Sequence, residues 1–252
     1  MCTLIILRRP GHDWPVIVGA NRDEMVARPW RPPGRHWSDR PEVFAGLDVM
    51  AGGSWLGIND HGVAAGILNR QGTLGPAPGQ RSRGELVLEA LDHADAVDAA
   101  HALAEIDPRA YRTFNMIVAD SRDAFWLKHG NDRGREPVAL HPLKEGLSMI
   151  AAGELDDPDS PRIRRYRARF LAAAAPDPER GDWLAWEKLL TDDSIDPEYG
   201  PTSAMKFATD RGFATVSSAL IALPSHERPT FKPVFRFASH RPTQTAWTNL
   251  VP

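Results

Sequence analysis

The sequence predicts an α+β fold, and three observations support this prediction. Short apolar runs typical of strands open the chain, return in its middle and return again near its end. Segments with helical periodicity lie between these groups of strands. The order strands, helices, strands, helices, strands favours separate α and β layers over a parallel βαβ arrangement. No break in composition divides the 252 residues, so we expect a single domain over residues 1–252.

The first 24 residues combine two predicted strands with the only cysteine of the chain, Cys2. Residues 2–8 and 15–20 are nearly continuous apolar runs, which suit strands covered on both faces. A turn over residues 10–13 would bring residues 21–24, Asn-Arg-Asp-Glu, back beside Cys2. Polar residues at the end of a buried strand need partners, because unpaired buried charge is costly. Those partners would form either an active site or a structural Arg–Asp pair.

Cys2 itself has two interpretations. Removal of Met1 would leave it with a thiol and a free α-amine, whose unperturbed pKa values are ~8.5 and ~7.7–8.0. An amine that is partly neutral at pH 7 can take the proton of the thiol, which is how an N-terminal nucleophile is activated. The alternative is a small buried hydrophobic residue, a frequent role of a lone cysteine.

The segment after these strands alternates loops with short strands. Residues 28–41 are predicted to be a loop, because a Pro-Pro pair suits neither a helix nor a central strand. This segment would either pack on the surface or bind an anionic or planar ligand. Strands are expected at 54–58 and 63–68, around a turn over 59–62. A Gly- and Pro-rich loop at 70–81 could act as a lid.

Four helices are predicted. The first runs from Ser82 to about residue 93, because Ser82 and Glu85 have the spacing of a capping box. The third begins after Ser160, with Pro161 at its first position. The second and fourth cover 96–106 and 183–190, and further strands are expected at 113–119, 124–129, 138–141, 147–151, 213–223 and 231–238.

Arginines are frequent in the third predicted helix. Five of them lie between residues 162 and 169. We expect them mostly on the face opposite the buried one, where they would be solvated or paired with Asp156, Asp157 and Asp159.

Composition and missing motifs exclude several classes of function. A net charge of −3 gives no sign of a nucleic-acid partner, and no apolar stretch reaches the ~18 residues of a membrane span. One cysteine excludes an intrachain disulfide and suits the cytoplasm. GxGxxG, Walker, HExxH and GxSxG motifs are absent, so we expect no metal and no cofactor. The expected partner is a small-molecule substrate or ligand, and the oligomeric state stays open.

Several motifs, in the same order along the chain, resemble the NRDE family, the bacterial relatives of transport and Golgi organisation protein 2. The similar pieces include MCTL at 1–4, ANRDE at 20–24, AGGSWLGI at 51–58 and the pair Asn69-Arg70. The match is dense over about residues 1–120 and thin afterwards. This family is grouped with the N-terminal nucleophile (Ntn) hydrolases, so the resemblance implies a four-layer αββα sandwich of two mainly antiparallel sheets.

The resemblance also implies an Ntn-type amidohydrolase that acts on a small amide. Cys2 would attack the carbonyl carbon, with its own α-amine as the base. Asp23 would hold the amine, Arg22 would stabilise the thiolate and Asn69 would donate to the oxyanion. We expect three further residues to contact the substrate, namely Asn21, Trp55 and Arg70.

Two departures from the related acylases keep a second function open. The acylases have a further Asn after the middle strands, whereas residues 149–156 here contain none. Their late catalytic Arg has no match, because Val-Ser-Ser occupies residues 216–218. The resemblance equally allows a non-catalytic haem- or lipid-binding or trafficking protein, with the loops at 28–37 and 70–81 framing its ligand cleft. No sequence feature supports a purely structural role.

Overall fold

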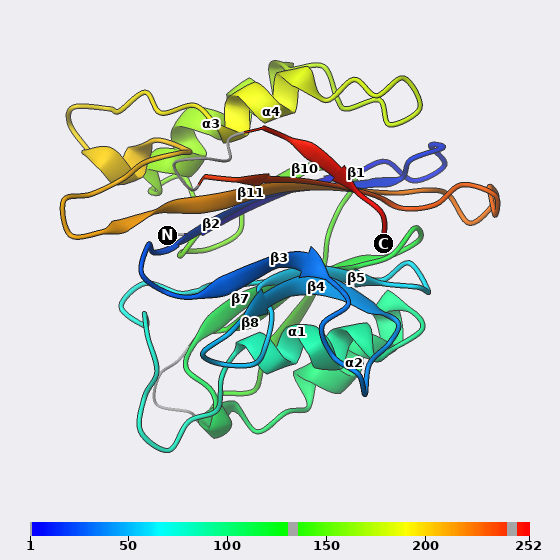
Figure 1. Cartoon of the computed structure of the whole chain (residues 1–252), viewed down its shortest axis with the longest axis horizontal. Coiled ribbons are helices and arrows are strands. Elements are labelled where there is room, and N and C mark those ends of the chain that lie inside the picture. Colours follow the sequence, from blue (N-terminus) through cyan, green and yellow to red (C-terminus); the bar gives the residue numbers. More distant parts are fainter. Residues whose placement is uncertain (1, 131–135, 241–245) are drawn as a thin grey trace. The chain divides into compact units, whose positions relative to one another are not determined.

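The computed structural model describes residues 2–130, 136–240 and 246–252. The chain divides into two compact units, each built around one antiparallel sheet. The first unit combines residues 1–28, 145–224 and 228–251, and the second combines residues 29–144, 225–227 and 252. In Figure 1 the blue strands from the start of the chain therefore share a sheet with the orange and red strands from its end.

The sheet of the first unit has six strands in the order β10-β1-β2-β11-β12-β13. Helices α3 (Pro161–Ala172) and α4 (Leu184–Leu190) cover one of its faces (Figure 1). Odd-numbered residues of β1 and β2, such as Ile5 and Ile17, enter the core beneath these helices. The strands are β1 (Thr3–Arg8), β2 (Val16–Met25), β10 (Gly146–Ile150), β11 (Phe213–Leu223), β12 (Val234–Ser239) and β13 (Thr248–Leu250), and a short 3₁₀ turn, η2, spans Pro201–Ser203.

The sheet of the second unit has seven strands in the order of the sequence, β3 to β9. Helices α1 (Gly84–Leu91) and α2 (Ala96–Ala104) lie against one face (Figure 1), with Leu86, Leu91 and Leu103 in the core between them and the sheet. The strands are β3 (Trp30–Gly34), β4 (Val43–Asp48), β5 (Leu56–Asn59), β6 (Ala64–Asn69), β7 (Phe114–Ala119), β8 (Ala124–His129) and β9 (Ala139–Pro142), and the 3₁₀ turn η1 spans Pro108–Ala110.

The predicted α+β class with two antiparallel sheets is confirmed, and so are several local signals. The Ser160 hydroxyl accepts a hydrogen bond from the Ile163 N–H, and Pro161 is the first residue of α3. The turn between β5 and β6 is held by the Asn59 side chain, and Gly62 adopts a φ of 87° that favours glycine. The expected single domain stays a prediction.

The prediction of a continuous loop over residues 28–41 is wrong. Residues 30–34 form β3, which lies at the edge of its sheet. The register of β3 against β4 shifts between Arg31 and Gly34, where Pro32 and Pro33 lie. A proline removes a ladder hydrogen bond, and an irregular edge strand is the place in a sheet that tolerates this loss. Strand β4 was also absent from the sequence prediction.

The predicted capping box at Ser82 is wrong as well. Helix α1 begins at Gly84, two residues later than expected, and ends at Leu91. The Ser82 hydroxyl accepts from the Gly84 N–H, while Glu85 pairs with Arg81 at 2.7 Å instead of reaching back to the cap. Helix α2 likewise ends at Ala104, before the predicted residue 106.

The polar segment 21–24 does not follow a strand, as predicted, but belongs to one. Strand β2 continues to Met25 because β11 pairs with it along its whole length, from Leu223 to Phe213. The backbone therefore stays in the sheet while the side chains of these residues find polar partners. None of the helices in the described ranges is long and apolar enough to cross a membrane.

Two strand glycines offer a test of this packing. A Cβ atom at Gly57 would lie 2.3 Å from the Ala45 Cβ and 3.0 Å from Leu91, whereas a Cβ at Gly19 would meet Trp186 at an ordinary 3.4 Å. We expect Gly57→Ala to lower the free energy of unfolding by roughly 1–3 kcal/mol through overpacking. Gly19→Ala serves as the matched control, with a change below about 1 kcal/mol. Urea titration measures both, and equal losses would contradict the packing described for β5.

Candidate active site

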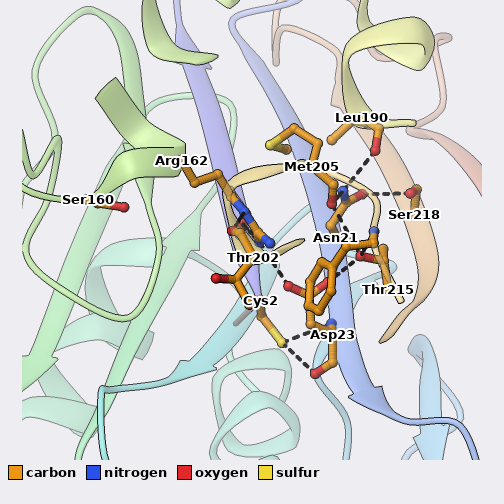
Figure 2. Close-up of polar contacts among 12 residues, drawn as sticks. Cys2, Asn21, Asp23, Ser160, Arg162, Leu190, Thr202, Met205, Thr215 and Ser218 are labelled. Atoms are coloured by element: carbon orange, nitrogen blue, oxygen red, sulfur yellow. Dashed lines mark hydrogen bonds and ion pairs between the residues drawn. The ribbon is translucent and has the colours of Figure 1, made fainter. Parts of the chain in front are cut away.

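Cys2 immediately precedes β1, the strand that lies between β10 and β2 in the first sheet. Antiparallel pairing of β1 with β2 sets Thr3 opposite Asn21, which brings the cysteine next to the end of β2. The Asp23 N–H donates to the Cys2 Sγ atom at 3.3 Å, and the thiol lies 3.5 Å from the Asp23 carbonyl oxygen (Figure 2). Cys2 is partly exposed. The predicted approach of Cys2 to the segment 21–24 is therefore observed.

The side chains of this segment alternate between the two faces of the sheet. Thr3, Asn21 and Asp23 share the face that α3 and α4 cover, as their hydrogen bonds to residues of these helices and of the turns beside them show. The Arg22 side chain lies on the opposite face of the sheet, and its guanidinium lies 3.9 Å from the Glu24 carboxylate. Arg22 and Asp23 thus approach the thiol from different sides.

The Asp23 carboxylate is completely buried and holds a charged partner that the sequence analysis missed. Its Oδ2 atom accepts from Arg162 Nη1 at 2.8 Å, and its Oδ1 atom accepts from the Thr215 hydroxyl at 2.7 Å (Figure 2). Only 3% of the Arg162 side chain is exposed. We expected the arginines of this helix at its surface or beside Asp156, a prediction that is confirmed for Arg167 and wrong for Arg162.

A sequence signal for Arg162 did exist. It lies four residues before Tyr166, which is fully buried, so it belongs to the inner face of α3. An arginine on the apolar face of a helix needs a buried acceptor. The pattern indicates that such an acceptor exists, but not that it is Asp23, 139 positions earlier.

Asn21 is the centre of a second set of hydrogen bonds. Its Nδ2 atom donates to the carbonyl oxygens of Leu190 and Met205 at 2.9 and 2.8 Å, which fixes the orientation of the amide. The Oδ1 atom must then accept, so the Ser218 hydroxyl at 2.6 Å donates to it. The Nε2 atom of His240, 2.7 Å from the same hydroxyl, therefore carries the hydrogen.

This direction of donation excludes Ser218 as a nucleophile activated by His240, because a base must accept the hydroxyl proton. Asn21, which we expected to contact substrate, is 2% exposed and bonded on both ends of its amide. These hydrogen bonds hold the Asn21 side chain within its own unit, and the expected substrate contact stays a prediction.

The thiol of Cys2 is shifted toward its neutral form. Burial raises the pKa of the Cys2 thiol, and the Asp23 carboxylate raises this pKa further. The Asp23 N–H and the Arg22 guanidinium act in the opposite direction, by stabilising the thiolate. Because burial and the carboxylate dominate, the thiol needs a base to become a nucleophile near neutral pH.

The other predicted residues belong to the second unit. Asn69 ends β6, where it pairs with Phe114, and is partly exposed. Arg70 Nη1 donates to the Asn115 Oδ1 atom at 2.8 Å. The ring of Trp55 meets that of Trp30 edge-on, with centroids 5.9 Å apart. Their expected roles toward an oxyanion or a substrate stay predictions.

The loop at 70–81, which we expected as a lid, is bonded to its own unit. The Arg112 guanidinium donates to the carbonyl oxygens of Gly72, Leu74 and Gly75. Arg83 donates to the carbonyl oxygens of Thr73 and Thr113. Opening of this loop would have to break these bonds. In the described part of the chain, no group of three or more His, Cys, Asp or Glu residues is arranged to hold a metal ion.

The fold, with two antiparallel sheets and four α-helices among the described residues, is of the class seen in the Ntn hydrolases, as its similarity to solved structures shows. A conjugated bile acid hydrolase from Clostridium perfringens aligns with a TM-score of 0.55 and 11% identity, over 99% of this chain and 92% of that chain. Penicillin V acylase from Agrobacterium tumefaciens aligns with a TM-score of 0.54 and 13% identity, over 99% and 86%. An N-acylethanolamine-hydrolyzing acid amidase ortholog from Caenorhabditis elegans aligns with a TM-score of 0.54 and 14% identity, over 87% of this chain and 92% of that chain.

The chain belongs to the Transport and Golgi organisation 2 family, whose model matches residues 1–225. This confirms the family predicted from the motifs near the start of the chain. A stretch of 143 residues is 36% identical to the Transport and Golgi organization protein 2 homolog of Bos taurus and 34% identical to that of Homo sapiens. The matched region covers 53% of this chain and 50% of each relative, so the chain spans about half the length of these curated relatives.

His240 gives a pH-dependent prediction. Burial and the positive charge of Lys206 lower the pKa of His240 to about 4. The folded protein then binds fewer protons than the unfolded chain between pH 4 and about 6.5. We expect the free energy of unfolding to fall as the pH drops through this window, by about 3 kcal/mol at most from this residue, and to be independent of His240 above it.

Urea titrations from pH 4 to 8 measure this contribution. His240→Asn should flatten the acid side of the stability profile relative to the unchanged protein, and the exposed His101→Asn should not. If the two variants and the parent show parallel profiles, His240 does not titrate as described.

Proposed function

We propose that this protein is an Ntn-type amidohydrolase that uses Cys2 on a small amide substrate. The observation that carries the proposal is the position of the Cys2 thiol, bonded to the Asp23 backbone at the end of β2. A thiol bonded to the strand backbone at this point, beside a buried carboxylate that has its own cation, is more than packing requires of a lone cysteine. The fold class and the order of the motifs support the same reaction.

The reaction begins once Met1 is removed and the Cys2 α-amine is free. The amine takes the proton of the thiol as Sγ bonds to the amide carbon, and the carbonyl π electrons move to the oxygen. The resemblance to the acylases would assign the donor to this oxyanion to Asn69. The tetrahedral intermediate expels the leaving amine, which takes the proton from the ammonium group, and leaves a thioester on Cys2. Water, deprotonated by the same amine, then cleaves the thioester to a carboxylic acid and restores the thiol.

The charged residues have separate roles in this proposal. Asp23 orients the α-amine and balances its charge when it becomes an ammonium group. Arg22, on the opposite face of the strand, stabilises the thiolate as it forms, since a nearby cation lowers the pKa of a thiol.

A binding or trafficking function on the same scaffold is the second candidate, and two observations favour it. The family description concerns transport and Golgi organisation rather than hydrolysis. Residues 149–156 and 216–218 also lack the Asn and the Arg of the acylases. A haem or a lipid would be its ligand. Binding of haem or an acyl ligand that is unaffected by Cys2→Ala, without any amide hydrolysis, would favour this function.

The enzymatic proposal predicts that hydrolysis depends on Cys2 and on its amine. A panel of N-acyl ethanolamides, penicillin V and conjugated bile acids samples amides of the classes that the similar structures name. We expect Cys2→Ala to lower kcat/KM by about 10³-fold or more on any amide that is hydrolysed, because the nucleophile is lost. Thermal unfolding of Cys2→Ala, expected to match that of the parent, controls for folding.

A second variant separates the amine from the thiol. Insertion of Glu between Met1 and Cys2 retains the initiator methionine and blocks the α-amine, while the thiol stays in the chain. Intact-mass measurement checks the start of each protein, and iodoacetamide labelling checks the thiol. Hydrolysis that survives the insertion, or a parent protein that retains Met1 and still hydrolyses the amide, would falsify the role of the amine.

A further inference from the structure

We propose that Arg162 is a positioning residue of the Cys2 centre, where its guanidinium fixes the Asp23 carboxylate and balances its charge. This inference rests on the proposed function, because it concerns the same thiol and amine. Arg162 comes from the first turn of α3, far along the chain from both Cys2 and Asp23. Its role toward the reaction would be indirect, since it contacts Asp23 and not the thiol.

The hydrogen bonds of Arg162 connect three segments of the first unit. Its Nη1 atom donates to the Asp23 carboxylate and to the Thr3 hydroxyl, each at 2.8 Å. Its Nε atom donates to the Thr202 carbonyl oxygen at 3.2 Å (Figure 2). The centroid of the Phe207 ring lies 5.3 Å from the Arg162 Cζ atom. The guanidinium is thereby locked between β1, β2 and the turn η2.

This arrangement fixes Asp23 as well. One carboxylate oxygen is held by Arg162 and the other by the Thr215 hydroxyl, which itself lies 3.2 Å from the Met205 carbonyl oxygen. Rotation of the Asp23 side chain would break both contacts in a fully buried site. The backbone of the same residue carries the N–H that donates to Cys2 Sγ. Arg162 therefore acts on a residue that directly contacts the thiol.

The charge of Arg162 matters because of the chemistry proposed for the amine. A carboxylate within ~4–6 Å of an ionisable group raises the pKa of that group by roughly 1–3 units, because the negative charge favours the protonated form. Without a compensating cation, Asp23 would keep the amine protonated and the thiol neutral, so the base would be lost. Among the residues that the structure describes, further charged or titratable groups around this centre include Arg22 and Glu24 on β2, Lys206 before β11, and His240 after β12.

Of these groups, Arg22 lies on the face of β2 opposite to the Asp23 carboxylate, and Glu24 lies beside Arg22. Arg162, in contrast, pairs with the Asp23 carboxylate at 2.8 Å on the buried face. It also supplies, from a helix, a positive charge that the Val-Ser-Ser segment at 216–218 does not contain.

Alkylation of Cys2 tests the inference, because Cys2 is the only cysteine of the chain. The rate of reaction with iodoacetamide between pH 6 and 10, followed by intact mass, reports the midpoint of thiol ionisation. We expect Arg162→Met to raise this midpoint by at least about one pH unit, which slows labelling about tenfold near pH 7.5. Arg162→Lys should give an intermediate value, and Arg164→Met, an exposed neighbour on the same helix, should leave the midpoint unchanged.

A double variant keeps the test decisive if Arg162→Met alone does not fold. Asp23→Asn leaves the Arg162 charge without its carboxylate and should lower the midpoint. Asp23→Asn combined with Arg162→Met removes both charges and should return the midpoint toward that of the parent, at least about one unit above Asp23→Asn. Equal midpoints for these two variants, or an unchanged midpoint in a folded Arg162→Met protein, would overturn the inference.

The readout also separates this inference from the proposed function. Labelling of Cys2 requires no turnover. If the parent protein hydrolyses no amide, the proposed function is wrong, but the midpoints of thiol ionisation still decide whether Arg162 acts on Cys2. In an active enzyme, Arg162→Lys should lower kcat with KM changed less than about threefold, because the substrate does not touch Arg162. If the protein is an active enzyme and substitution of Arg162 changes neither kcat nor the midpoint of thiol ionisation, only the positioning role of Arg162 is wrong.

Discussion

The buried ion pair between Arg162 and Asp23 is the interaction on which the rest of the site depends. Both side chains are almost completely removed from water, so their desolvation is costly. The pair is tolerable because each charge also finds neutral partners, Thr215 for the carboxylate and Thr3 and Thr202 for the guanidinium. Removal of one partner of such a pair typically costs 3–5 kcal/mol, since a buried charge is left without compensation. Asp23, which this pair holds in place, is also the residue whose backbone N–H donates to the Cys2 thiol.

The same pair explains how a polar segment can continue a central strand. Strand β2 keeps its backbone ladder with β1 and β11, while every second side chain from Gly19 to Asp23 faces the helices. Gly19 packs beside Trp186, Asn21 bonds two carbonyl oxygens, and Asp23 bonds Arg162. The face of the sheet thus changes from apolar to polar along one strand. The thiol of Cys2 lies at the polar end of this gradient.

The sequence alone predicted most of what depends on neighbours in the chain. Apolar runs identified β1 and β11, the turn at 59–62 was visible in Asn59 and Gly62, and Ser160 with Pro161 marked the start of α3. These features arise from side-chain periodicity and local backbone chemistry, which a sequence shows directly. The approach of Cys2 to the end of β2 was also predictable, because it requires only an antiparallel hairpin.

What could not be predicted depends on which distant segments pair. The end of β2 was placed too early because the partner that extends it, β11, lies almost two hundred residues later. The prolines of β3 suggested a loop, since nothing local reveals that the strand lies at an edge. Arg162 and His240 were missed for a related reason. Their hydrogen-bond acceptors are fixed by the sheet order, which the local patterns did not contain.

The charge balance of the site connects these structural features to the choice between the two functions. A thiol whose pKa is raised by burial and by Asp23 is a poor nucleophile without a base, and a protein that only carries a ligand has no need for one. A buried carboxylate needs a compensating cation in a carrier as much as in an enzyme, so the ion pair of Arg162 and Asp23 does not by itself separate the two functions. In the proposed reaction the arginine has a second consequence, because a free amine beside an uncompensated carboxylate would stay protonated at neutral pH. The reactivity of Cys2, and not the cost of burying Arg162 and Asp23, therefore separates the two functions.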